Sequence, residues 1–127
     1  MLTEDSRESL RRAAAKVADD LISAVPGFRV LHSDNVENYG EFLFAPFYWD
    51  VVESTVLSYL GDEDEPDWRS TLEFMEAKIR SDDDAEKSIV VSEFLYNLPN
   101  RGQPGHELIR HLGPELTKNF ARMTQGR

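Results

Sequence analysis

Three histidines are the natural candidates for metal chemistry in this chain of 127 residues, because it contains no cysteine. His106 and His111 enclose the segment His-Glu-Leu-Ile-Arg-His, which is similar to the zinc motif H-E-x-x-H except that its histidines lie five residues apart. Five residues along an α-helix separate two side chains by roughly 140°, so they cannot hold one ion together. His32 is distant from both in the sequence. We therefore expect surface or capping roles for the histidines, with no metal and no cofactor.

Carboxylates are the second source of chemistry, and their spacing also argues against catalysis. The acidic segment at 62–67 lacks the alternating ligands and the glycine of a calcium-binding loop, and Pro66 interrupts it. Asp50 and Glu53 follow an aromatic segment, but their spacing of three predicts that both face solvent on one helix. The serine and glycine-loop motifs of hydrolases and nucleotide-binding proteins are absent from the sequence. The sequence therefore favours a protein without enzymatic activity.

The acidic residues are distributed unevenly along a chain whose formal net charge is -10. Residues 62–86 contain 11 acidic and 3 basic residues, whereas residues 101–127 contain 2 acidic and 5 basic residues. A surface of this kind repels nucleic acid and accelerates the encounter with a basic partner. The alternative is that these acids stabilise helix N-termini and increase solubility.

Aromatic residues are concentrated between positions 39 and 49. This window holds 6 of the 13 aromatic residues of the chain, and they cannot all face one core. Successive side chains on a helix point about 100° apart, so at least one of Phe47, Tyr48 and Trp49 is expected near the surface. Exposed aromatic side chains are effective anchors in protein interfaces. Core packing with one half-exposed ring is the alternative.

Hydrophobic periodicity predicts an all-α protein, folded as one compact domain over residues 1–127. The bundle is expected to have five to six helices that form antiparallel pairs. A short extended segment is expected near residues 28–45, because the turn-forming residues there interrupt the helical pattern. No apolar run is long enough for a membrane span, and we expect a cytoplasmic protein. The expected helices cover residues 5–25, 46–60, 67–80, 83–98, 106–112 and 114–123.

The C-terminal two-thirds contain an acidic segment at Ser81–Glu86, an apolar helix at Ile89–Leu98 and the segment Leu112-Gly-Pro-Glu-Leu116. In these elements the chain resembles a group of small acidic bacterial proteins that are associated with polymorphic-toxin immunity. The resemblance implies a compact helical protein without enzymatic activity. It also implies that the chain binds a cognate toxin domain in the cytoplasm and blocks the active site of that domain. No individual binding residue carries over from the group.

The leading hypothesis is thus an immunity or antitoxin-like protein that neutralises a basic toxin through an acidic surface, without nucleic acid or membrane. The alternatives are a helical adaptor or homodimeric structural protein that buries the aromatic segment, and an enzyme that uses Asp50 or Glu53. The expected partner-binding residues are acidic or aromatic: Asp62, Glu63, Asp64, Glu65, Asp67, Asp82, Asp83, Asp84, Glu86, Tyr39, Tyr48 and Trp49.

Overall fold

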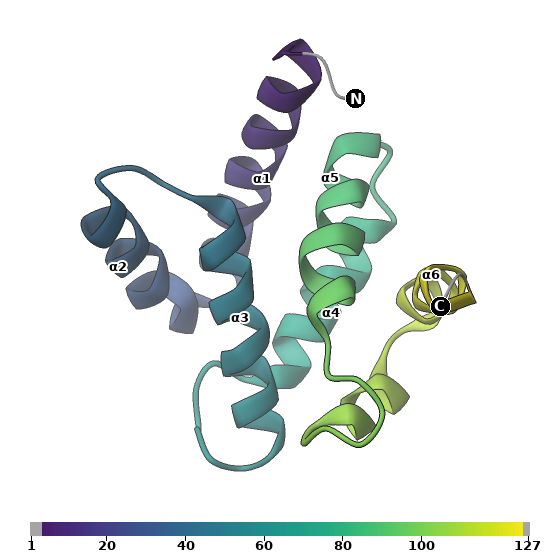
Figure 1. Ribbon diagram of the computed structural model, residues 1–127. Helices are drawn as coiled ribbons and strands as arrows, with labels where there is room; N and C mark the ends of the chain where they lie inside the picture. Colours follow the sequence, from purple (N-terminus) through teal and green to yellow (C-terminus); the bar gives the residue numbers. More distant parts are fainter. Residues whose placement is uncertain (1–3, 126–127) are drawn as a thin grey trace.

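The computed structural model describes residues 4–125 and is helical throughout its regular structure (Figure 1). The predicted all-α fold is confirmed, and residues 1–3 and 126–127 of the predicted 1–127 domain lie outside the described residues. Six α-helices lie in the described part, joined or extended by shorter helical turns. The bounds are α1 Glu4–Ala24, η1 Pro26–Phe28, α2 Arg29–Tyr39, α3 Phe44–Tyr59, α4 Trp68–Ile79, α5 Asp84–Ile89, η2 Val90–Phe94, η3 Leu95–Asn97, η4 His106–His111 and α6 Pro114–Gln125.

The core is built around α1, whose small residues let neighbouring helices approach closely. Ala14, Val17, Ala18 and Leu21 are fully buried at helical spacing, as the periodicity of the sequence predicts. The helix packs along α5 and also contacts α4 and α3 (Figure 1). Large side chains fill the space that the alanines leave. Those that are fully buried include Phe28, Phe47, Tyr48, Met75, Phe94 and Leu95.

The extended segment predicted near residues 28–45 is wrong for most of that range, because the chain forms α2 there. This helix has only a weak apolar stripe, so tertiary contacts must stabilise it. The buried Asn35 supplies one of them: its side chain donates to the Leu43 carbonyl (3.0 Å) and accepts from the Leu43 amide (2.9 Å). Gly40 ends α2 with φ of 75°, a left-handed conformation that favours glycine. Only around Leu43 is the backbone extended.

The helix predicted over 83–98 is present but not uniform. Its first part is α5, and it continues as the π-helix η2 and the 3-10 turn η3. A wider turn changes which residues share a face. Val90 and Phe94 of η2 and Leu95 of η3 are all buried.

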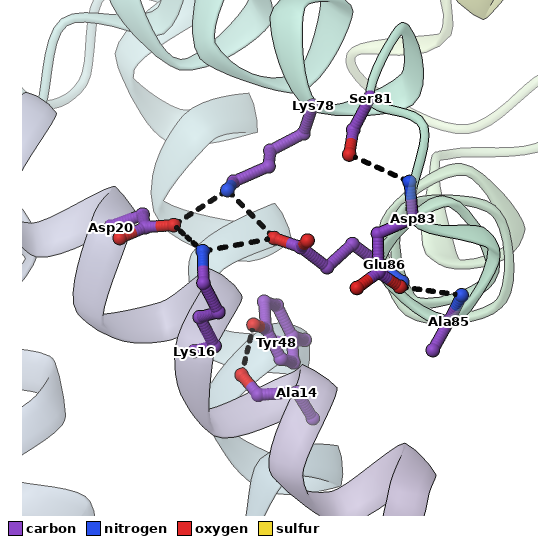
Figure 2. A network of polar contacts seen from close by, with 9 residues as sticks. All are labelled: Ala14, Lys16, Asp20, Tyr48, Lys78, Ser81, Asp83, Ala85 and Glu86. Atoms are coloured by element: carbon purple, nitrogen blue, oxygen red, sulfur yellow. Dashed lines mark hydrogen bonds and ion pairs between the residues drawn. The ribbon is translucent and has the colours of Figure 1, made fainter.

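A cluster of four alternating charges joins α1, α4 and α5 (Figure 2). Lys78 bridges Asp20 and Glu86, with 2.8 Å between its Nζ and Glu86 Oε1, and Lys16 contacts the same two carboxylates at 2.9 and 3.4 Å. Hydrogen bonding from Lys78 lowers the pKa of the Asp20 carboxyl. Because each carboxylate has two cationic neighbours, Glu86 can be almost fully buried without an unpaired charge.

A second polar contact fastens α6 to α4. The Glu76 side chain accepts hydrogen bonds from the backbone amides of Glu115 (3.1 Å) and Leu116 (3.0 Å) at the start of α6, and from Arg80 Nε (2.9 Å). Burial alone would raise the pKa of Glu76, but these hydrogen bonds outweigh it and lower the pKa below its ordinary value of 4.5. Gly113 leaves room for the carboxylate, since a Cβ there would lie 2.6 Å from Glu76 Cδ.

We predict that Lys78→Met lowers the free energy of unfolding by about 2 kcal/mol, because it leaves Glu86 with one cation. The double variant Lys78→Met/Glu86→Leu should recover part of this loss, since it removes the unpaired charge as well. The exposed pair Glu8–Arg11 offers a control, and Arg11→Met should change stability by less than about 0.5 kcal/mol. Urea unfolding followed by circular dichroism measures all three. Equal effects of Lys78→Met and Arg11→Met would contradict a central role for the cluster.

We predict that Glu76→Gln destabilises the protein by about 1 kcal/mol at neutral pH. A lowered pKa in the folded state means that the charge stabilises the fold above the ordinary value of 4.5 and loses this effect as the pH falls through the folded pKa. The difference between wild type and variant in urea unfolding should therefore shrink between about pH 7 and about pH 3. Glu73→Gln, at an exposed position of the same helix, is the control. A difference that is independent of pH would contradict this role of the charge.

Candidate functional site

The structure separates the acidic residues into two turns instead of one patch. Residues 62–67 precede α4 and residues 82–84 follow it (Figure 1). Since α4 has 12 residues, the two turns lie roughly 18 Å apart, at opposite ends of the helix. The acidic residues thus lie on one helix and its two flanking turns, as the sequence indicates, and the two turns are considered separately.

Three of the predicted partner-binding acids already have structural roles. Asp67 caps α4, accepting from the Ser70 amide (3.3 Å) and hydroxyl (2.9 Å), and Asp83 caps α5, accepting from the amides of Ala85 (2.9 Å) and Glu86 (3.1 Å; Figure 2). Both capping side chains lie in exposed residues. Glu86 is different because it is only 5% exposed and belongs to the charge cluster. The prediction that Glu86 contacts a partner is wrong.

The acids of residues 62–65 remain available to a partner. All four are exposed, and no ion pair or side-chain hydrogen bond to them occurs within residues 4–125. The turn is nevertheless held firmly at both ends. The Asp62 amide donates to the Leu57 carbonyl (2.9 Å), and the buried Pro66 packs against Gly27, where a Cβ would lie 3.1 Å from it. We call residues 62–65 the acidic turn.

The two neighbouring aromatic residues of α3 have opposite environments. Tyr48 is 1% exposed, and its hydroxyl donates to the Ala14 carbonyl at 2.7 Å (Figure 2). Burial raises the pKa of this hydroxyl. The prediction that Tyr48 anchors a partner is therefore wrong. Trp49 is 56% exposed and Tyr39 is 51% exposed, so the expectation that an aromatic residue of this segment reaches the surface is confirmed.

Trp49 borders an open groove of about 310 Å³ between α3 and the loop that follows η3. We call this the Trp49 groove. Helix α3 forms one wall and residues 97–104 form the other. These two segments are distant in the sequence, and no motif indicates that they meet. The lining is mostly apolar: Trp49, Val52, Glu53, Val56, Leu57, Asn97, Pro99, Gln103 and Pro104.

Hydrogen bonds hold the loop wall of the groove in shape. The Gln103 side chain accepts from the Asn100 amide (2.7 Å), while the Gln103 amide donates to the Asn100 carbonyl (3.0 Å). His106 Nδ1 lies 3.0 Å from the Pro99 carbonyl oxygen, which gives this histidine a structural role. Gly105 has φ of 88° and meets α3 closely, since a Cβ there would lie 2.5 Å from Val56 Cγ1. The wall is thus organised before any partner binds.

A larger groove of about 490 Å³ lies between α4 and the segment around His111. Glu76, Arg69 and His111 in its lining already have partners within the fold. Glu76 binds Arg80 and the start of α6, and Arg69 stacks 4.4 Å from the centre of the Trp68 ring. His111 packs on the same ring, at 4.9 Å between centroids. These contacts make this groove part of the packing between α4 and the segment around His111.

Neither a metal site nor a membrane-spanning helix is found in the described part of the chain. Within residues 4–125 no group of three or more His, Asp or Glu side chains is arranged to hold a metal ion. In the same part of the chain, none of the helices combines the length and apolar character needed to cross a bilayer. No family model, curated protein or solved structure matches the chain. The acidic turn and the Trp49 groove are therefore the candidate functional surfaces of the protein.

We predict different effects for substitutions at the two neighbouring aromatic positions. Tyr48→Phe should lower the free energy of unfolding by about 1 kcal/mol, because the buried Ala14 carbonyl loses its hydroxyl partner. Trp49→Ala should change it by less than about 0.5 kcal/mol, because the indole lies largely in solvent. Thermal or urea unfolding of both variants tests this. A Trp49→Ala variant that is the less stable of the two would show that the groove is part of the core.

Proposed function

We propose that this protein is a non-enzymatic binding protein that neutralises a basic protein partner, in the manner of an immunity or antitoxin-like inhibitor in the cytoplasm. The observation that carries this proposal is the acidic turn. Its four carboxylates are exposed and have no partners in the described part of the chain, while Asp20, Glu76 and Glu86 are engaged within the fold.

Electrostatics supports a basic partner over an acidic one. The chain has a formal net charge of -10, so its field attracts cationic proteins and repels nucleic acid. The acidic turn concentrates part of this charge at one end of α3, on a backbone that Leu57 and Pro66 hold in place. A preorganised charged turn loses little conformational entropy on binding. The resemblance to immunity-type proteins supports a toxin domain as the partner.

Two matched charge reversals test the role of the acidic turn. Asp62→Lys/Asp64→Lys changes the acidic turn, and Asp82→Lys/Asp84→Lys makes the same change in charge at the opposite end of α4. We predict that the first variant recovers about tenfold less of the basic partner than wild type in a tagged pull-down from native cells at about 50 mM salt. The second variant should stay within about twofold of wild type, and recovery by wild type should fall at about 300 mM salt.

Circular dichroism of both variants establishes that each remains folded before recovery is compared. Equal recovery of the partner by the two variants would show that net charge, and not the acidic turn, attracts it. Recovery of the protein alone, as a dimer, would favour the homodimeric structural protein over an inhibitor.

A further inference from the structure

The Trp49 groove is an apolar surface without an occupant from the described part of the chain. Trp49 is more than half exposed, and Val52, Val56, Leu57, Pro99 and Pro104 line the groove beside it. Contiguous exposed apolar surface of this kind marks interaction sites. Because the groove is open and shallow, it would leave much of a small molecule in solvent, whereas small-molecule pockets enclose most of their ligands. Its form suits side chains presented by another protein.

The length of the groove suits one face of a helix. Its α3 wall runs from Trp49 to Leu57, eight residues further along the helix, which corresponds to about 12 Å. The first and last apolar side chains of a helical stripe with i, i+3 or i+4, and i+7 spacing are about 10 Å apart. Three apolar side chains on one face of a helix therefore match the wall in length.

The charges around the groove define the occupant further. Among the described residues, Glu53 is the only charged one in the groove lining, and the exposed Asp50 lies one turn away on α3. At the other end, the Leu57 carbonyl accepts from the Asp62 amide, so the acidic turn begins beside the C-terminal end of the α3 wall. Arg101, the basic residue of the loop wall, is not part of the lining. A second copy of this chain would bring like charges together, which opposes self-association at this surface.

We propose that the Trp49 groove binds the apolar stripe of a basic amphipathic helix from the protein partner, while Lys or Arg residues of that helix contact the acidic turn. This inference rests on the proposed function, because it assigns the apolar half of the same interface. Trp49 is the main anchor, since a rigid exposed aromatic residue beside a preformed apolar wall has the character of an interface hot spot.

Synthetic peptides of about 14 residues test this proposal on the full chain labelled with ¹⁵N. The first peptide places Leu on one helical face and Lys elsewhere. The second has the same composition but distributes Leu around the helix, and the third replaces each Lys of the first by Glu. Peptide titrations followed by amide chemical shifts give both affinity and location. We expect the first peptide to bind most tightly and to shift amides of residues 49–57 and 97–104.

Substitutions in the protein then separate the two halves of the interface. Trp49→Ala should weaken binding of the first peptide by roughly tenfold or more. Val30→Ala shortens an exposed apolar side chain on α2 and should leave the affinity unchanged. Asp62→Lys/Asp64→Lys should weaken binding and reduce its dependence on salt.

Three outcomes would overturn the proposal, and they are distinguishable. Equal affinity for the first and second peptides would show that the groove does not bind an apolar helix face. The acidic turn would then remain the site for a basic partner. Equal affinity for the first and third peptides would show that binding does not require a basic partner, which would contradict the proposed function. Shifts of the groove amides with protein concentration, in the absence of peptide, would assign the groove to self-association.

Discussion

The pairing of two lysines with two carboxylates between α1, α4 and α5 is the interaction on which the rest of the structure depends. Lys78 contacts Asp20, which lies 58 residues earlier, and Lys16 contacts Glu86, which lies 70 residues later. These contacts hold the pair α4 and α5 against the helix at the centre of the core. Because Glu86 is almost completely buried, the fold must place both Lys16 and Lys78 beside its carboxylate. The orientation of α4 determines in turn where the acidic turn and α6 lie.

Two groups of acidic residues in this protein have different physical tasks. One group is hydrogen-bonded within the fold: Glu76 at the start of α6, Asp67 and Asp83 at helix N-termini, and Glu86 in the charge cluster. The other group, in the acidic turn, contributes to the electric field in solvent. The first group therefore contributes to stability, and we propose that the second contributes to recognition of a basic partner.

Much of the fold could be predicted from hydrophobic periodicity, because α1, α3 and α4 each bury one face of a regular helix. The helix α2 could not, since its stability depends on the contacts of Asn35 with Leu43 and on the buried Phe28. The candidate site was predictable only in part. Residue types indicated the acidic turn and one exposed aromatic residue, but Tyr48 and Trp49 are adjacent, and a rotation of about 100° decides which is buried.

The sequence by itself determined the all-α class, most helix boundaries and the excess of acidic charge, because these depend on local spacing and composition. Only the tertiary structure decided that Glu86 is buried in a charge cluster and that Tyr48, not Trp49, faces the core. It also created the Trp49 groove, whose walls come from residues 49–57 and 97–104. The physical reason is that these features arise from contacts between segments distant in the chain, and helical periodicity carries no information about which faces will meet.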